Sequence, residues 1–265
     1  MKELIMADEF FATDRQKFAP LAARMRPKTL EEYAGQEHIL GPGKLFTRAI
    51  EADRLSSIVL YGPPGSGKTT LALCISERTQ AHFESINAVM SNVEEMRKII
   101  SAARNRLVAS SRRTILFIDE IHRFNKAQQD VLMPDVESGT IILIGATTMN
   151  PFFSLVSPLI SRSLVFELKP LSRDNIISLL RRALEDSERG LGSLNVKADT
   201  KALEFIAETS DGDARRALSA LEVGVLTTPK SKDGNIHFTL QIAEESIQKK
   251  IVQYDADGDL HYDTA

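Results

Sequence analysis

The sequence predicts an α/β fold, in which a five-stranded parallel sheet flanked by helices precedes a small all-helical lid domain. Up to about residue 169, short apolar runs alternate with stretches whose apolar residues recur at helical spacing, as in a sheet with crossover helices. From Ser172 onward only helical patterns separated by turn-rich segments are found. We therefore expect an N-terminal arm over 1–20, an α/β domain over 21–169, a lid over 170–252 and a tail over 253–265.

The expected strands are uninterrupted apolar runs, a pattern typical of parallel strands that are covered on both faces. They lie at 57–60, 82–87, 114–120, 141–148 and 164–168. Between them, helices are expected at 44–53, from residue 71, at 91–108, at 126–136 with an interruption at Pro134, and at 154–161. The lid helices are expected at 172–187, 199–209, 213–226 and 239–251.

Composition excludes several classes of protein. The chain has 265 residues and a net charge of -3, so any nucleic-acid contact must come from a local basic patch. One cysteine, Cys74, allows no intramolecular disulfide and is expected to pack in the core. No apolar run is long enough to span a membrane, and no signal-peptide pattern is found. These features predict a cytoplasmic protein with no membrane partner.

A glycine-rich stretch between the first strand and the next helix carries the strongest chemical signal. Such a turn aims backbone N–H groups at a polyphosphate, and the helix N-terminus adds its dipole. Lys68 can reach the β- and γ-phosphates, and the Thr69 hydroxyl can ligate Mg²⁺. The motif therefore predicts binding of ATP and Mg²⁺. Its residues are Gly62, Pro63, Pro64, Gly65, Ser66, Gly67, Lys68, Thr69 and Thr70.

Two carboxylates end the third strand. Ligands of parallel sheets bind at the carboxyl ends of strands, which places Asp119 and Glu120 beside the phosphate loop. Asp119 can hold Mg²⁺ through its water shell, and Glu120 can accept a proton from the attacking water. Two acids that merely cap a strand are the alternative, which the upstream loop disfavours.

The fourth strand ends in hydroxyls at the same expected edge. Thr148 can hydrogen-bond the attacking water or the γ-phosphate, or it is simply a turn hydroxyl with its own hydrogen-bond partner.

The helix after the second strand has a basic face, formed by Arg97, Lys98 and Arg104. This face is either a solvated surface or a track for a nucleic-acid backbone.

The phosphate loop, Asp119–Glu120, Thr148 and the helical lid together resemble the AAA+ class of P-loop ATPases. Leu159–Arg162 resembles the motif that carries the arginine finger of this class, and Gly212–Arg215 resembles its second sensor. The resemblance implies that Arg215 acts in cis and that Arg162 acts on a neighbouring subunit, each stabilising charge on the transferring phosphoryl group. Without the resemblance, the spacing alone would favour interpreting each arginine as a surface salt-bridge partner.

Within this class the chain is similar to the replication-associated recombination protein A family, whose eukaryotic relative is the Werner-helicase-interacting protein. The resemblance is carried by Leu21–Pro27 with Gly35–Gln36, Phe117–Asp130, Ile144–Thr148 and Ser210–Leu218. It covers nearly all of the chain after residue 20.

The family resemblance implies a DNA-dependent ATPase for replication fork maintenance, recombination and repair. Implied partners are DNA ends, single-strand gaps and forks, single-stranded-DNA-binding protein, and further copies of the chain in a homotetramer; the implied location is cytoplasmic and nucleoid-associated. The resemblance places Tyr33, Ala34, Gln36 and Ile39 against adenine, and implies that Asn87 holds the catalytic glutamate inactive until DNA binds.

Family members continue with further helices that carry tetramer contacts, so the assembly of this chain, and the use of Arg162 in trans, stay open.

Three other functions compete with the fork-associated ATPase. A clamp-loader-like subunit or a Holliday-junction branch-migration motor would share Thr148, Arg162 and Arg215, but those families lack the run Arg123–Lys126. The third is a nucleotide-binding scaffold that hydrolyses ATP poorly. The presence of Lys68, Asp119 and Glu120 argues against this function.

Overall fold

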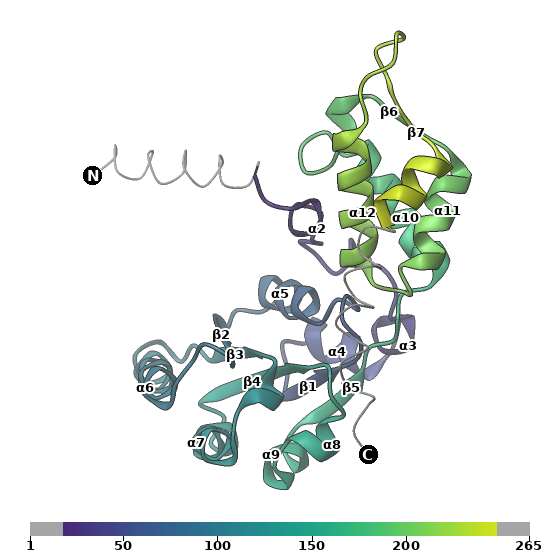
Figure 1. Cartoon of the computed structure of the whole chain (residues 1–265). Coiled ribbons are helices and arrows are strands. Elements are labelled where there is room, and N and C mark those ends of the chain that lie inside the picture. The colour runs from purple at the N-terminus through teal and green to yellow at the C-terminus, as the bar shows by residue number, and fades with distance from the viewer. Residues whose placement is uncertain (1–17, 248–265) are drawn as a thin grey trace, which may run out of the picture. The chain divides into compact units, whose positions relative to one another are not determined.

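The structure is a computed structural model that describes residues 18–247, and these form two units (Figure 1). The first unit comprises residues 27–170 and contains the large sheet. The second comprises residues 18–26 and 171–247 and is mostly helical. The predicted tail, most of the predicted arm and the end of the last predicted helix lie outside the described residues.

The large sheet consists of five parallel strands in the order β2-β3-β4-β1-β5. Ile58 of β1 pairs with Ile144 of β4 on one side and with Leu164 of β5 on the other. The predicted five-stranded parallel sheet is therefore confirmed, and β1 and β3 are interior strands. The strands are β1 (Ile58–Tyr61), β2 (His82–Asn87), β3 (Thr114–Asp119), β4 (Ile141–Thr147) and β5 (Leu164–Glu167).

Alternate residues of the strands enter two apolar cores, one on each face of the sheet. Leu60 and Phe117 face the core under α3, α4 and α5, whereas Val59 and Leu116 face the core under α6, α7 and α9 (Figure 1). The helices of this unit are α3 (Glu37–Leu40), α4 (Leu45–Glu51), α5 (Lys68–Arg78), α6 (Val93–Ser110), η1 (Ile121–Arg123), α7 (Lys126–Glu137), α8 (Pro151–Ser154) and α9 (Ser157–Ser161).

Three helix predictions are corrected in this unit. The stretch predicted as one helix at 154–161 is divided between α8 and α9, which are separated by Leu155 and Val156. The cap of α6 is Asn92, not Ser91, and its Oδ1 accepts from the N–H of Glu95 at 2.9 Å. Pro134 does not interrupt α7, which continues to Glu137 because a proline removes only its own donor. The carbonyl of Pro134 itself accepts from the N–H of Ser138 at 3.0 Å, so the hydrogen-bond ladder resumes.

Cys74 is completely buried on α5, and its thiol lies 3.5 Å from the carbonyl oxygens of Pro27 and Thr29. Burial raises the pKa of the thiol to about 11, which keeps it neutral. The predicted core thiol is confirmed. Over residues 18–247, no helix is long and apolar enough to cross a membrane.

The second unit packs its helices around one apolar core, in which Leu21, Leu180, Ile206, Leu221 and Phe238 are buried. Its elements are α2 (Leu21–Arg24), α10 (Arg173–Glu185), η2 (Gly192–Leu194), β6 (Val196–Ala198), α11 (Thr200–Thr209), α12 (Ala214–Thr227), β7 (Ile236–Phe238) and the helical residues 240–247.

The prediction that this unit is all-helical was wrong in one respect. β6 and β7 pair in parallel, with Val196 opposite Ile236. Three-residue strands are too short to produce an alternating pattern, so their turn-rich surroundings hid them. Moreover, residues 21–26 group with this unit rather than with the α/β unit, because the N–H of Leu21 donates to the carboxylate of Glu222 at 2.9 Å and α2 packs on α12.

Candidate nucleotide site

The glycine-rich loop joins β1 to α5, as the sequence predicted, and glycine is required at two of its positions. Gly67 has φ 98°, and a side chain there would also collide with the Tyr33 hydroxyl. A side chain at Gly62 would collide with the backbone carbonyl of Leu168, beyond the end of β5. The loop therefore combines left-handed backbone with close approach of neighbouring groups.

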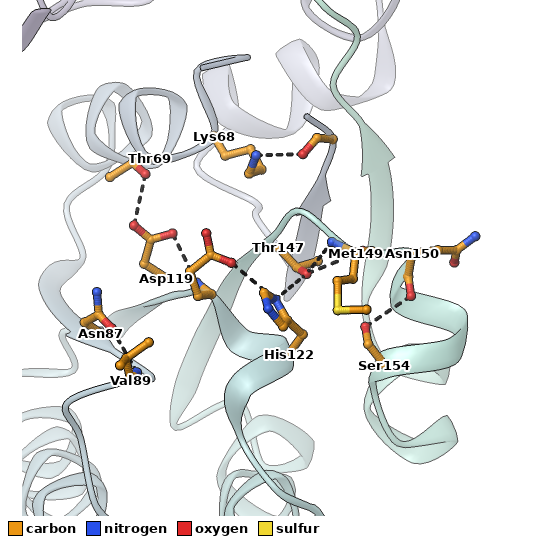
Figure 2. Close-up of polar contacts among 12 residues, drawn as sticks. Lys68, Thr69, Asn87, Val89, Asp119, His122, Thr147, Met149, Asn150 and Ser154 are labelled. Carbon is orange, nitrogen blue, oxygen red and sulfur yellow. Dashed lines mark hydrogen bonds and ion pairs between the residues drawn. The ribbon is translucent and has the colours of Figure 1, made fainter. Parts of the chain in front are cut away.

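Two side chains of the loop make it suitable for a polyphosphate. The Lys68 ammonium group donates to the carbonyls of Gly62 and Pro63, at 2.8 and 2.9 Å, and thus lies over the loop (Figure 2). Ser66 is buried, and its hydroxyl has no hydrogen-bond partner among the described residues. Because a buried polar group without a partner is costly, this hydroxyl fits a phosphate oxygen as its missing acceptor.

The pair that fits Mg²⁺ joins the first turn of α5 to the end of β3. The Thr69 hydroxyl lies 3.2 Å from Oδ2 of Asp119, at the carboxyl end of β3 (Figure 2). One hydroxyl and one carboxylate, with phosphates and water completing the shell, is a ligand set that Mg²⁺ accepts. No group of three or more His, Cys, Asp or Glu residues that could hold a metal is found within residues 18–247.

Glu120 follows β3 in an unusual backbone conformation, with φ 54° in the left-handed region. Such a conformation is uncommon for a residue other than glycine, and it is found disproportionately at functional sites. The N–H of Glu120 donates to Oδ1 of Asp119 at 3.1 Å. This contact anchors the turn that separates the two carboxylates.

Sequence reasoning missed two further residues at this edge. Oε2 of Glu120 lies 3.2 Å from Nδ1 of His122, and the same nitrogen lies 2.9 Å from the hydroxyl of Thr147 (Figure 2). His122 belongs to η1 and Thr147 ends β4, so the contact joins two strand ends. The order Asp-Glu-Ile-His did show a histidine near the carboxylates, but only the turn into η1 brings it back onto Glu120.

Thr148 and Asn87 lie at the same edge but make different contacts from Thr147. Thr148 is exposed directly after β4, and its action on water or phosphate stays a prediction. Asn87 pairs in register with Asp119, and its side-chain oxygen accepts from the N–H of Val89 at 2.9 Å (Figure 2). In this structure the Glu120 carboxylate therefore lies beside His122, while the side chain of Asn87 closes its own turn.

The segment predicted to lie against adenine is attached to the phosphate loop. The Tyr33 hydroxyl donates to the carbonyl of Ser66 at 3.2 Å, and burial raises the pKa of this phenol well above its ordinary value. The side-chain amide of Gln36 donates to the carbonyl of Lys169 at 2.7 Å and accepts from its N–H at 2.9 Å. Gln36 thus braces the backbone, whereas Ile39 enters the core with α4 and α5.

The two predicted arginines lie in different units. Arg162 follows α9, and its guanidinium lies 2.7 Å from Oε1 of Glu137 and 3.0 Å from the carbonyl of Pro158. Arg215 lies in the first turn of α12 and is exposed. Asp213 caps this helix by accepting from the N–H of Arg216 at 3.0 Å. Their predicted roles toward the nucleotide stay predictions.

The basic face of α6 is partly neutralised. Lys98 lies 2.9 Å from Glu94, one turn away, and Arg104 forms a bidentate contact of 2.7 and 2.8 Å with the buried carboxylate of Asp135 on α7. The Arg104–Asp135 hydrogen bonds and attraction raise the pKa of the guanidinium. Arg97 remains exposed. Of the three predicted DNA contacts, Arg104 therefore has an internal partner that ties α6 to α7.

Comparisons with known proteins agree with this geometry. Residues 25–161 match the family described as the Holliday junction DNA helicase RuvB P-loop domain. Replication-associated recombination protein A of Escherichia coli K12 is 47% identical over 93% of this chain, and that of Bacillus subtilis is 46% identical over 92%. The chain belongs to this P-loop family, and over most of its length it is similar to replication-associated recombination protein A. The predicted resemblance and the AAA+ fold class are confirmed.

More distant relatives support the same family. The ATPase WRNIP1 of Dictyostelium discoideum is 39% identical over 94% of this chain and 30% of its own length. Residues 192–265 match the AAA C-terminal domain. The Thermotoga maritima RuvB Holliday junction branch migration motor superposes with a TM-score of 0.68 at 28% identity, over 85% of this chain and 73% of that one. The chain spans 57% and 55% of the B. subtilis and E. coli proteins of the family.

Proposed function

We propose that this chain is an AAA+ module that hydrolyses ATP with Mg²⁺ and couples hydrolysis to DNA. The observation that carries the proposal is the meeting of Thr69, at the amino end of α5, with Asp119 and Glu120, at the carboxyl end of β3, beside a glycine-rich loop. A loop for the phosphates, an oxygen pair for Mg²⁺ and a carboxylate for the water are the parts that phosphoryl transfer requires.

Each of these residues has a proposed role. Lys68 leaves its carbonyl partners to neutralise the β- and γ-phosphates, and Thr69 with Asp119 holds Mg²⁺. Glu120 orients the attacking water and accepts its proton. Thr148 contacts the γ-phosphate or the water. Tyr33, Ala34, Gln36 and Ile39 form the adenine side, with Gln36 acting through the backbone that it braces.

The two arginines are proposed to complete the site electrostatically. Arg215 contacts the nucleotide of its own chain, and Arg162 contacts the nucleotide of a neighbouring copy, as a homotetramer of the family would allow. Arg162 must then exchange Glu137 for phosphate. The present pair is half-exposed and such pairs are weak, so this exchange has a small cost.

The proposed biological role is the maintenance, recombination and repair of replication forks, because the relatives named above are replication-associated recombination proteins. The proposed substrates are DNA ends, single-strand gaps and forks, and single-stranded-DNA-binding protein is a partner. The association is with nucleoid DNA. Arg97 and Lys98 carry the proposed DNA contact, because Arg104 has an internal partner.

Steady-state ATP hydrolysis over a range of protein concentrations tests the proposal. It is measured without DNA, with single strands and with duplexes that bear single-strand ends, for the wild type and for Arg162→Ala. Stimulation by DNA ends that rises with concentration and is lost in Arg162→Ala would support a shared site. Slow hydrolysis that ignores both DNA and the substitution would refute DNA coupling and the role of Arg162.

A second candidate is a branch-migration motor, favoured by the match of residues 25–161 to the RuvB P-loop domain. Four-way junctions distinguish the two functions. A branch-migration motor would separate the arms of a junction in an ATP-dependent reaction and would be stimulated by junctions more than by DNA ends. A fork-remodelling ATPase would show the opposite preference.

A further inference from the structure

Glu120 is held from two directions at the carboxyl end of β3. Its backbone N–H is anchored on Asp119, and its carboxylate oxygen Oε2 lies 3.2 Å from Nδ1 of His122. The His122 side chain is only 8% exposed, so this contact is largely shielded from water. A left-handed backbone conformation at a residue other than glycine persists only where the surrounding structure imposes it. The imidazole of His122 is the side chain that lies against the Glu120 carboxylate.

The contacts of Nδ1 determine where the histidine carries its proton. Nδ1 forms its hydrogen bond with the hydroxyl of Thr147, and Oε2 of Glu120, which can only accept, lies 3.2 Å from the same nitrogen. The hydroxyl oxygen of Thr147, 2.9 Å from Nδ1, already accepts from the N–H of Met149 at 3.0 Å. The hydrogen of this hydroxyl is directed at the carbonyl of Met149, 3.4 Å away, so the oxygen accepts from the Nδ1–H of His122 and fixes the plane of the ring.

We propose that His122 is a positioning residue for hydrolysis, which orients the Glu120 carboxylate and couples it to the end of β4 through Thr147. The inference rests on the proposed ATP hydrolysis and adds a residue to it. With Oε2 lying against the imidazole, Oε1 is left to orient the attacking water. His122 itself does not touch the nucleotide.

The same contact links the water-activating group to the strand whose next residue is Thr148. The 147–150 turn is closed on the Thr147 hydroxyl, and Asn150 at its end caps α8 by accepting from the N–H of Phe152 at 3.0 Å. A shift of this turn would move Thr147 and, through the ring of His122, the carboxylate of Glu120. Asn87, the residue expected to hold the glutamate, bonds its own loop and provides no such link.

Kinetics of His122→Ala in the full chain test the proposal, with hydrolysis and the binding of a fluorescent ATP analogue measured separately. We expect kcat to fall about tenfold to a hundredfold, because a misplaced base forfeits part of the roughly 10²–10⁴-fold that such a group contributes. Nucleotide affinity should stay unchanged, because the phosphate loop is untouched. His122→Asn, whose amide N–H can donate from a similar position, should restore most of the rate.

Non-additivity separates positioning from a general structural role. Adding His122→Ala to Glu120→Gln should cost nothing further in kcat, because the group to be oriented has already lost its function. The matched control is His82→Ala, which removes another His–Glu contact, of 2.7 Å to Glu84. This contact lies at the amino end of β2, whereas Glu120 follows the carboxyl end of β3. This control should hydrolyse ATP like the wild type. Melting temperatures show whether each variant folds.

The outcomes are distinguishable. If the wild type hydrolyses ATP and His122→Ala retains its kcat, the inference is refuted while the proposed function stands. The inference is likewise refuted if the loss in His122→Ala persists undiminished on top of Glu120→Gln. A folded wild type that never hydrolyses ATP, with any DNA, would refute the proposed function and the inference together.

Discussion

The two units use polar side chains for different purposes. In the α/β unit, side chains contact one another at one edge of the sheet, as in Thr69–Asp119 and Glu120–His122. In the helical unit, several polar side chains instead fix the path of the backbone. Arg24, for example, donates to the carbonyls of Arg189 and Gly190, at 2.8 and 3.0 Å.

This difference indicates which part of the molecule rearranges during function. A contact between two side chains can be exchanged for a ligand while the chain keeps its path, whereas a contact to the backbone defines that path. Substitutions at the sheet edge should therefore change rates with little effect on stability. Substitutions inside the helical unit should change stability first, and four predictions test this contrast.

The largest expected effect is on catalysis at the sheet edge. Glu120→Gln keeps the size of the side chain but cannot accept the proton of water, so kcat should fall about 10²-fold or more. The melting temperature should stay near that of the wild type, because Glu120 is not part of either core. The matched control is Glu185→Gln, an exposed position on α10. Unchanged hydrolysis in Glu120→Gln would contradict the assignment.

The second prediction concerns packing in the helical unit. A methyl group at Gly224 on α12 would approach the Phe238 ring and the Ser246 hydroxyl within 2.5 Å. Gly224→Ala should therefore lower the free energy of unfolding by about 1–3 kcal/mol, the usual cost of overpacking. Urea denaturation measures the loss. Val223→Ala, at an exposed neighbour on the same helix, should change it much less.

A third prediction sharpens the comparison, because Arg104 lies in the α/β unit yet has a structural partner. Arg104→Ala leaves the carboxylate of Asp135, only 3% exposed, without its bidentate donor, so the melting temperature should fall. Arg97→Glu should leave it unchanged and weaken DNA binding, with a smaller salt dependence. Thermal melting and DNA titrations at several salt concentrations decide between these roles. Equal DNA affinity in Arg97→Glu and the wild type would remove α6 from the DNA interface.

The smallest effect is expected at Asp186 in the helical unit. The pKa of this carboxyl is lowered, chiefly by the backbone N–H of Arg189, with further bonds from the Arg189 side chain and the N–H of Glu188. A lowered pKa contributes stability above the unfolded value of about 3.9, and this stability is lost as pH falls through the folded value. Asp186→Asn should thus destabilise the protein at pH 7 and less at pH 3. A pH-independent difference in unfolding free energy would contradict this linkage.

Most of the α/β unit could be predicted because its signals are local. The run at 114–119 is apolar at nearly every position because β3 is buried on both faces, and the loop from Gly62 to Lys68 needs glycines wherever the backbone turns left. Proximity of Asp119 to Thr69 also followed, because carboxyl ends of parallel strands meet at one edge. Three-residue β6 and β7 could not be predicted, since their pairing joins residues about 40 positions apart.

The partners of individual side chains were much less predictable. The bond of Gln36 to the carbonyl of Lys169 and the bond of Arg104 to Asp135 were not predicted. In both cases the partner is distant in the chain, so no local pattern identifies it. Charge and position describe what a side chain can bind, but packing decides which acceptor is within reach.

The sequence by itself determined the parallel sheet, the phosphate loop and the pair of carboxylates, because each depends on short-range periodicity, turn chemistry or the rule that strand ends converge. Only the tertiary structure decided that His122 lies beside Glu120, that Asn87 bonds its own turn, and that residues 21–26 belong with the helical unit. The physical reason is that hydrogen bonds form within about 3 Å, and only the folded backbone brings groups from separate elements to that distance.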